Sequence, residues 1–156
     1  MVAPNYSGEL TDFGVAPQST LHFPIAADTP TTIPRGTVLR TEELREATQR
    51  GTLDGAKFLM FDVLEYHHTQ TIEGAQRLEY AGAGTDFNDD VQRRLSSDLK
   101  AAVNNNLAMP VVFFCEGSAC WESYNAGLRA EKIGFTKVYW YRGGLFAWKA
   151  AGFPLK

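Results

Sequence analysis

The sequence predicts a single α/β domain with a central, mostly parallel sheet, helices on both faces and an irregular N-terminal arm. Candidate strands and helices alternate after residue 37, which is the pattern of parallel sheets. Two apolar runs, at 58–63 and 111–114, are short and continuous, as in strands that are buried on both faces. A chain of 156 residues with 44% hydrophobic residues is long enough to enclose one sizeable core.

Residues 1–36 are expected to form the arm, and residues 37–156 the domain that it covers. Prolines at positions 4, 17, 24, 30 and 34 break any helix or central strand in the arm. Apolar side chains recur between them and give the arm anchors on the domain surface. The first residues lack the charged and apolar regions of a signal peptide, so they fit either a genuine start or the start of a processed chain.

The first half of the domain has two strand candidates and one helix. Residues 37–40 form a short strand, and Thr41 is expected to cap the helix that follows. The apolar run at 58–63 is the second strand. Residues 64–86 are expected to be a long loop region, with weak strand character near 75–78.

The second half alternates more regularly. Apolar residues recur every four positions between Asp89 and Val103, as in an amphipathic helix. The expected elements are a helix over 89–103, a strand over 111–114, a helix over 122–133, a strand over 137–141 and a helix over 145–151. Parallel sheets bind ligands outside the carboxyl ends of their strands, so the residues just after 111–114 lie where a site is expected.

Cys115 follows that central strand directly. Four residues then lead to Cys120 and Trp121, before the next helix begins. A thiol between a strand end and a helix N-terminus sits where loop amides and the helix dipole stabilise a thiolate. Cys120 is the chain's second and last cysteine, and it shares this loop. The arrangement indicates sulfur or redox chemistry.

The stretch from Val111 to Lys156 resembles the C-terminal half of a rhodanese domain. The resemblance rests on a strand, a cysteine loop, a helix, a Gly-Phe pair, a second strand, a Gly-Gly pair and a tryptophan, in that order. The matching residues are Val111–Cys115, Ser123, Ala126, Gly127, Ala130, Gly134, Phe135, Val138, Gly143, Gly144, Trp148, Ala151, Gly152 and Pro154. Asp62-Val63 and Ile72-x-Gly74-Ala75 extend the match upstream, so it covers about 37–156. It implies a three-layer α/β/α fold.

A narrower similarity is to bacterial rhodanese-like proteins associated with pyrroloquinoline-quinone-dependent catabolism. These are named for a Cys-x-x-Cys-Trp motif and are usually exported to the periplasm. Here four residues separate the cysteines, so only the Cys120-Trp121 pair matches literally. The resemblance implies a periplasmic location, with a cytoplasmic one as the alternative.

The rhodanese resemblance implies that the chain is a sulfurtransferase or persulfide carrier. Cys115 would carry sulfane sulfur as a persulfide, and Cys120 would act as a resolving thiol. The amides of 116–121 would form the cradle for the sulfur. The expected substrate-binding residues are Glu116, Gly117, Ser118, Ala119, Trp121 and Arg142, with Asp62 and Gly143 in support. Trp121 is also expected to be a lid over the loop or a core anchor, and the core position is favoured.

The loop departs from the family's usual Cys-x-x-Gly-x-Arg-Ser pattern in its charge. It contains no arginine or lysine and carries Glu116, with Glu122 at the helix start. Because both carboxylates oppose an anion, we expect weak activity with thiosulfate. Arg142, after the neighbouring strand, is the best remaining cation for the site.

Two rival functions stay open. One is a thiol–disulfide redox protein that uses both cysteines; the other is a non-catalytic rhodanese-fold module that binds a protein. Phosphatase chemistry needs Cys-x5-Arg, but position 121 is tryptophan. The expected partners are a small sulfur donor, a thiol acceptor and a protein acceptor. A net charge of -3 without a basic run argues against nucleic acid. No apolar run suits a membrane span, and no cofactor or metal is expected.

Overall fold

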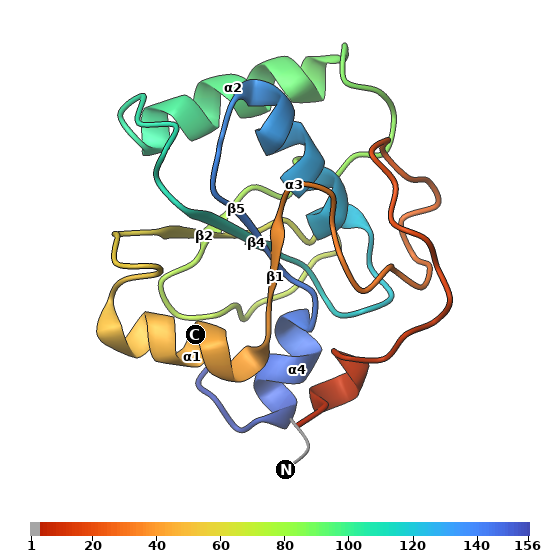
Figure 1. Cartoon of the computed structure of the whole chain (residues 1–156), viewed down its shortest axis with the longest axis vertical. Helices are drawn as coiled ribbons and strands as arrows, with labels where there is room; N and C mark the ends of the chain where they lie inside the picture. Colours follow the sequence, from red (N-terminus) through yellow and green to blue (C-terminus); the bar gives the residue numbers. More distant parts are fainter. Residues whose placement is uncertain (1–3) are drawn as a thin grey trace.

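A five-stranded sheet lies between two layers of helices in the computed structural model, which describes residues 4–156 (Figure 1). The strands are β1 (Thr37–Leu39), β2 (Leu59–Asp62), β3 (Gln76–Arg77), β4 (Val111–Phe114) and β5 (Val138–Tyr141). They lie in the order β1-β5-β4-β2-β3, and every neighbouring pair is parallel. The sequence predicted a mostly parallel sheet, which is confirmed.

Helices cover both faces of the sheet. They are α1 (Thr41–Arg50), α2 (Asp90–Ala102), α3 (Glu122–Ile133) and α4 (Gly144–Ala150), with a short 3-10 turn, η1 (Tyr6–Gly8), in the arm. Figure 1 shows α2 and α3 on one face and α1 and α4 on the other, which confirms the three-layer α/β/α expectation. None of the helices in the described part of the chain is long and apolar enough to cross a bilayer.

The alternation of side chains along β4 decides where Cys115 points. Val111 and Phe113 pack in the core beneath α2 and α3, whereas Val112 and Phe114 pack in the core beneath α1 and α4. Side chains of a strand alternate between the two faces of its sheet. Cys115 continues the first set and faces the layer of α2 and α3.

One predicted helix cap is wrong. Helix α1 begins at Thr41, so the N-cap position belongs to Arg40 and not to Thr41. The side chain of Arg40 makes no capping hydrogen bond. The Thr41 hydroxyl is engaged elsewhere, by Glu9 at 3.0 Å and Tyr141 at 2.6 Å. The free N–H of Arg40 is instead bound by Glu43 Oε1 at 2.8 Å, from inside the first turn.

The N-terminal arm runs along the molecule from α4 toward α3 (Figure 1). Asn125 on α3 holds it through both amide atoms: Oδ1 accepts from His22 N at 2.9 Å, and Nδ2 donates to His22 O at 3.0 Å. Thr29 and Ile33 of the arm are buried as deeply as core residues. The arm is therefore part of the packed structure.

Candidate active site

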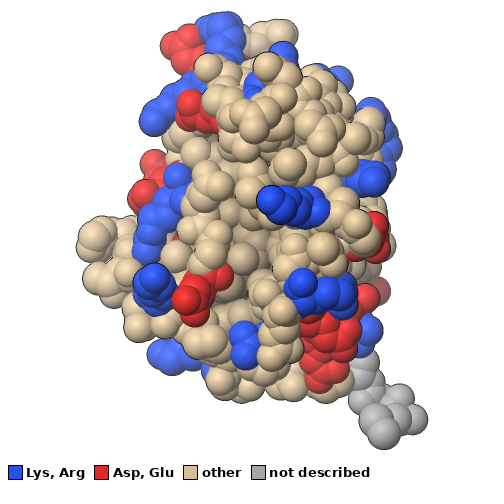
Figure 2. Space-filling model, turned by 90° about the vertical axis from the view of Figure 1, so that its left-hand side faces the viewer, with Lys and Arg blue, Asp and Glu red and all other residues tan. Residues whose placement is uncertain are grey.

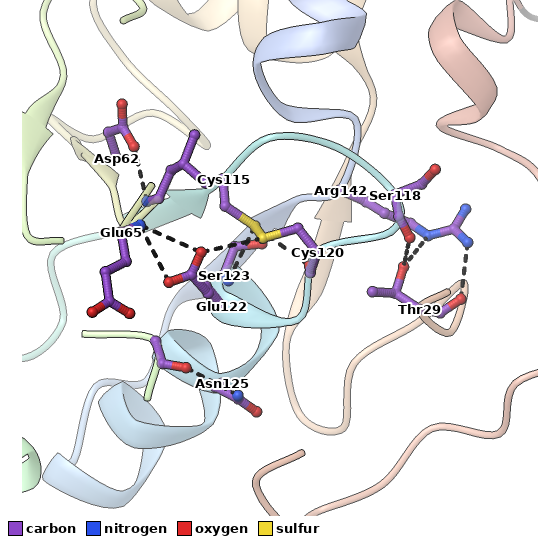
Figure 3. Close-up of a disulfide and its surroundings, with 12 residues drawn as sticks. Thr29, Asp62, Glu65, Cys115, Ser118, Cys120, Glu122, Ser123, Asn125 and Arg142 are labelled. Carbon is purple, nitrogen blue, oxygen red and sulfur yellow. Dashed lines mark hydrogen bonds between the residues drawn. A yellow bond between two sulfur atoms is a disulfide. The ribbon is translucent and has the colours of Figure 1, made fainter. Parts of the chain in front are cut away.

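Cys115 and Cys120 form a disulfide at the carboxyl end of β4 (Figure 3). Their Cα atoms are 6.5 Å apart, which is within the range that disulfides require. Cys120 lies in the curled loop before α3, which begins only at Glu122, so the backbone there is free to bring the two residues together. The pairing that the sequence left open is thus present in the structure.

The sulfur of Cys115 is buried against the first turn of α3. Ser123 donates to it through the backbone N–H at 3.4 Å, and the Ser123 hydroxyl lies 3.1 Å away. The cysteine itself is only 1% exposed. Donors at a helix N-terminus stabilise negative charge, so this position favours a Cys115 thiolate whenever the disulfide opens.

The N-terminus of α4 fixes the start of the cysteine loop. Leu145 N donates to Cys115 O at 3.0 Å, and Phe146 N donates to Glu116 O at 2.9 Å. This close approach requires Gly144, which has a φ of +61° and whose added Cβ would lie 2.4 Å from Cys115 O. Gly144 of the Gly143-Gly144 pair therefore allows α4 to pack closely against the cysteine loop.

The N-terminal arm pairs with the other side of the loop in an extended, antiparallel manner. Ala27 N donates to Ala119 O and Thr29 N donates to Ser118 O, both at 3.1 Å. Ala26 and Cys120 pair in the same way and form an isolated antiparallel bridge. The loop thus lies between the arm and α4, and neither neighbour belongs to the sheet.

Two of the six amides in the predicted cradle, those of Cys120 and Trp121, are engaged elsewhere. Cys120 N donates to Gly117 O at 3.2 Å and Trp121 N donates to Ile25 O at 2.9 Å, so these two amides turn away from the sulfur. The amide that does contact Cys115 Sγ belongs to Ser123, beyond the predicted range. The arm takes the amide of Trp121, which a single-sequence pattern does not reveal.

Arg142 also has a different role from the one predicted. Its guanidinium donates to Thr29 Oγ1 at 3.0 Å, to Thr29 O at 3.0 Å and to Glu9 O at 2.9 Å. Figure 3 shows it on the side of the loop away from the disulfide. Arg142 is 2% exposed and anchors the arm, so it is not the cation of the site.

Trp121 is a second anchor for the arm. Its indole N–H donates to Asp28 O at 3.0 Å, and its ring stacks on His22 with centroids 3.9 Å apart. The side chain is fully buried. Trp121 thus binds the arm rather than a substrate. Gly117, another predicted site residue, lies against Phe146 of α4, whose ring would be 3.0 Å from an added Cβ.

A cavity of about 590 Å³ opens beside the disulfide. Of the two cysteines, Cys120 lines it and is 7% exposed, whereas Cys115 does not line it. The other lining residues are Ile25, Ala26, Leu64, Glu65, Tyr66, Glu116, Ala119 and Glu122. Only Cys120, Glu116 and Ala119 among them were predicted as site residues. A small molecule in the cavity therefore meets the sulfur of Cys120 first.

Glu122 is a buried carboxyl at the boundary of cavity and disulfide. Its Oε1 lies 3.6 Å from Cys120 Sγ, and Glu65 N donates to its two oxygens at 3.3 and 3.2 Å. Burial raises the pKa of Glu122 to about 7, partly offset by the Glu65 amide and reinforced by the charges of Glu65, Asp62 and Glu116. Near neutral pH this carboxyl can accept or donate a proton beside Cys120.

Asp62 supports the loop that follows β2. Its Oδ1 accepts from Leu64 N at 3.0 Å, and its Oδ2 accepts from Thr71 Oγ1 at 2.6 Å. His68 Nε2 lies 2.6 Å from the same Oδ2. Asp62 therefore orients the segment that carries Leu64 and Glu65 into the cavity, in line with the supporting role that the sequence suggested.

The family of the chain follows from a comparison with family models. The model of the rhodanese-like domain matches residues 41–151, which is most of the chain. The chain belongs to the rhodanese-like domain family. Cys115 of this rhodanese-like domain stands at the strand end where the sequence pattern placed it, between the carboxyl end of β4 and α3. No curated protein matches the sequence.

Solved structures agree with the rhodanese-like fold. A yeast protein tyrosine phosphatase of the rhodanese family matches with a TM-score of 0.59 and 19% identity, over 76% of this chain and 88% of that one. A rhodanese-like domain from Anabaena sp. matches with a TM-score of 0.54 and 23% identity, over 76% of each chain. A thiosulfate sulfurtransferase from Pseudomonas aeruginosa matches with a TM-score of 0.54 and 16% identity, over 78% of this chain but only 20% of that one. At these identities the likeness shows the fold alone.

Sequence reasoning did not foresee several residues of the rhodanese-like domain's site. Ser123 was within reach, because it belongs to the family pattern that follows the cysteine. Ile25 was expected only as an apolar anchor of the arm, and Thr29 gave no signal. Thr29 acts through a contact with a distant loop, from Thr29 Oγ1 to Ser118 O at a sequence separation of 89. Glu65 was hidden in a long irregular segment, whose path depends on Asp62.

Proposed function

We propose that this rhodanese-like domain is a thiol–disulfide redox protein in which Cys120 exchanges with an external thiol or disulfide and Cys115 is its buried partner. One observation carries the proposal: the two cysteines are paired, and Cys120 is the one that lines the cavity. The redox function was a rival to the sulfurtransferase reading of the sequence. The burial of Cys115 now favours it, as does the engagement of the Cys120 and Trp121 amides away from the sulfur.

The exchange proceeds in two steps that conserve atoms and electrons. An external thiolate attacks Cys120 Sγ, the Cys115–Cys120 bond breaks, and Cys115 leaves as a thiolate beside the Ser123 donors. A second external thiolate then attacks the mixed disulfide and releases Cys120. Two external thiols become one disulfide, and the protein disulfide becomes two thiols. The reverse sequence oxidises the protein.

A redox titration of the full chain tests this function. The protein is equilibrated with mixtures of reduced and oxidised glutathione, alkylated and weighed by mass spectrometry. We expect one reversible, two-electron disulfide per chain, which disappears in Cys115→Ser and in Cys120→Ser. A protein that keeps both thiols, or both sulfurs oxidised, across the whole range of mixtures would contradict the proposal.

A second candidate function is acceptance of sulfane sulfur on Cys115. The Ser123 donors at Cys115 Sγ favour it, because they stabilise the anionic sulfur that a transfer requires. A donor would place its sulfur on the Cys115 thiolate, and Cys120 would then attack Cys115 Sγ and expel hydrosulfide, which leaves the disulfide. Sulfane sulfur is thereby reduced as the two thiols are oxidised. This route would make the protein a sulfurtransferase or persulfide carrier.

Cysteine persulfide separates the two candidates. In reduced Cys120→Ser, sulfane transfer predicts a gain of about 32 Da on Cys115, one sulfur atom. In the unaltered protein it predicts one sulfide released for each disulfide formed. The redox function alone predicts no stable gain in Cys120→Ser.

A further inference from the structure

The cavity beside Cys120 has walls of two kinds. Ile25, Leu64 and the ring of Tyr66 supply apolar surface, and the cavity volume of about 590 Å³ is typical of sites for small molecules. Tyr66 is 75% exposed, so its ring face is open to a ligand. A ligand that fills this space needs an apolar body of a few carbon atoms next to the sulfur.

The charged residues of the cavity all carry the same sign. They are Glu65, Glu116 and, once it has released its proton above about pH 7, Glu122. The part of the chain that the structure describes contributes no lysine, arginine or histidine to the lining. Asp62 adds a fourth carboxylate close enough to raise the pKa of Glu122. Arg142, the cation expected here, is turned to the arm. The field at Cys120 therefore attracts cations and repels anions.

This bias belongs to the cavity and not to the molecule as a whole. Figure 2 shows acidic and basic side chains interspersed on one face, without a continuous field of either sign. The net charge of the chain is only -3. A preference for cations at Cys120 therefore arises from the local carboxylates.

We infer that the cavity is the binding site for small, amine-bearing thiols and disulfides, with the ammonium group held among Glu65, Glu116 and Glu122 and the sulfur directed at Cys120. Tyr66 supports this assignment, since an exposed aromatic ring face attracts an ammonium group. The inference rests on the proposed redox function and names the substrate class for it. Anionic thiols and disulfides are then poor substrates.

Three symmetric disulfides of similar size test the inference. They are cystamine, which carries two ammonium groups, 2-hydroxyethyl disulfide, which is neutral, and 3,3′-dithiodipropionate, which carries two carboxylates. Each oxidises the reduced protein through a mixed disulfide on Cys120, and each is thereby reduced to two thiols. Rates are measured by stopped flow and divided by the rate of the same disulfide with dithiothreitol, which removes differences in intrinsic reactivity.

We expect normalised rates in the order cationic, neutral, anionic, with about tenfold or more between the first and the last at low salt. The spread should shrink in about 1 M salt, where the screening length is about 3 Å. It should also shrink in Glu65→Gln/Glu116→Gln, which leaves the cysteines and Glu122 in place. Glu46→Gln on α1 removes an exposed carboxylate outside the cavity lining and should leave the spread unchanged.

The outcomes separate this inference from the function beneath it. Equal normalised rates for the three probes, or a spread that the double variant does not reduce, overturn the substrate class but leave the redox function standing. If the reduced protein forms its disulfide with none of the probes, both are overturned.

Discussion

The indole N–H of Trp140 donates to Ser123 Oγ at 2.9 Å, and this bond directs the serine hydroxyl at Cys115. Because the oxygen accepts from Trp140, its hydrogen is free to point at Cys115 Sγ, 3.1 Å away. Trp140 is fully buried in β5 and is paired with Phe113 of β4. The register of the sheet therefore places Trp140 where its indole N–H turns the Ser123 hydroxyl hydrogen toward the buried sulfur.

Removal of the Ser123 hydroxyl should weaken the stabilisation of the Cys115 thiolate. In a Cys120→Ser background, Ser123→Ala should raise the pKa of Cys115 by about 0.5–1 unit, because one hydrogen bond is worth about 1 kcal/mol. The ultraviolet absorbance of the thiolate, followed against pH, measures this change. Ser97→Ala, at an exposed position on α2, is the control. An unchanged pKa in Ser123→Ala would show that the hydroxyl does not stabilise the anion.

Thr29 joins three parts of the site, and its loss should loosen the cysteine loop. Its hydroxyl donates to Ser118 O at 2.6 Å and accepts from Arg142 Nε at 3.0 Å. Thr29→Val keeps the shape but leaves Arg142 Nε without its partner, and Ser118 O keeps only its bond from Thr29 N. We therefore expect a loss of about 1–3 kcal/mol in the free energy of unfolding. The reduced variant should also be alkylated faster at its cysteines. Thr136→Val, at an exposed position, should change neither quantity.

Gly144 and Gly152 provide a matched pair for the approach of α4 to the loop. Both have positive φ, +61° and +80°, but an added Cβ meets Cys115 O at 2.4 Å only at Gly144, whereas Gly152 has no atom within 4 Å. Gly152→Ala should cost about 1–2 kcal/mol, the backbone cost of a left-handed residue. Gly144→Ala should cost clearly more and should shift the redox equilibrium of the cysteine pair. Equal losses of stability in the two variants would mean that the contact is easily relieved.

The buried carboxyl of Glu122 should make the fold weaker as the pH rises. Its pKa is raised from 4.5 to about 7 by burial, so the unfolded chain releases this proton before the folded protein does. Its contribution to stability is complete below about pH 4.5 and is lost as the pH passes about 7. Glu122→Gln has no carboxyl to ionise, so its free energy of unfolding should not fall with pH for this reason. Relative to the unaltered protein, this free energy should rise by on the order of 1–3 kcal/mol between about pH 4.5 and pH 8.

Chemical denaturation of both proteins at several pH values measures this difference. Burial also raises the pKa of Glu131 to about 7. Because Glu131 titrates in both proteins, its effect cancels in the difference between their unfolding free energies. A difference in unfolding free energy that stays constant with pH would show that Glu122 is not protonated in the folded state.

The central part of the fold could be predicted from the sequence because its apolar residues follow regular patterns. Helix α3 was predicted over its full extent, 122–133, since its start follows the cysteine loop and Gly134 ends it. The run at 111–114 identified β4, and the alternation along it places Cys115 toward α3. Local patterns of this kind depend on neighbours in the sequence and survive without knowledge of the rest of the chain.

The site was only partly predictable because its walls come from irregular, distant segments. The arm contributes Ile25 and Ala26, and the loop after β2 contributes Leu64 to Tyr66, without any repeating pattern. The role of Arg142 was misjudged for the same reason, and the substrate-binding role listed for Trp121 also gives way to a contact with the arm. The core position favoured for Trp121 agrees with its full burial. Proximity along the chain placed both residues near the cysteine, but hydrogen bonds with partners about a hundred residues away decided their function.

A comparison of the two single-cysteine variants tests most directly which sulfur meets the external partner. Reduced Cys115→Ser and Cys120→Ser are each mixed with 2-hydroxyethyl disulfide, and the mixed disulfide is followed by mass spectrometry. We expect Cys120, in the wall of the cavity, to react about tenfold faster or more than Cys115, which is 1% exposed. A Cys115 that reacts as fast as Cys120 or faster would contradict the assignment of Cys120 as the exchanging sulfur.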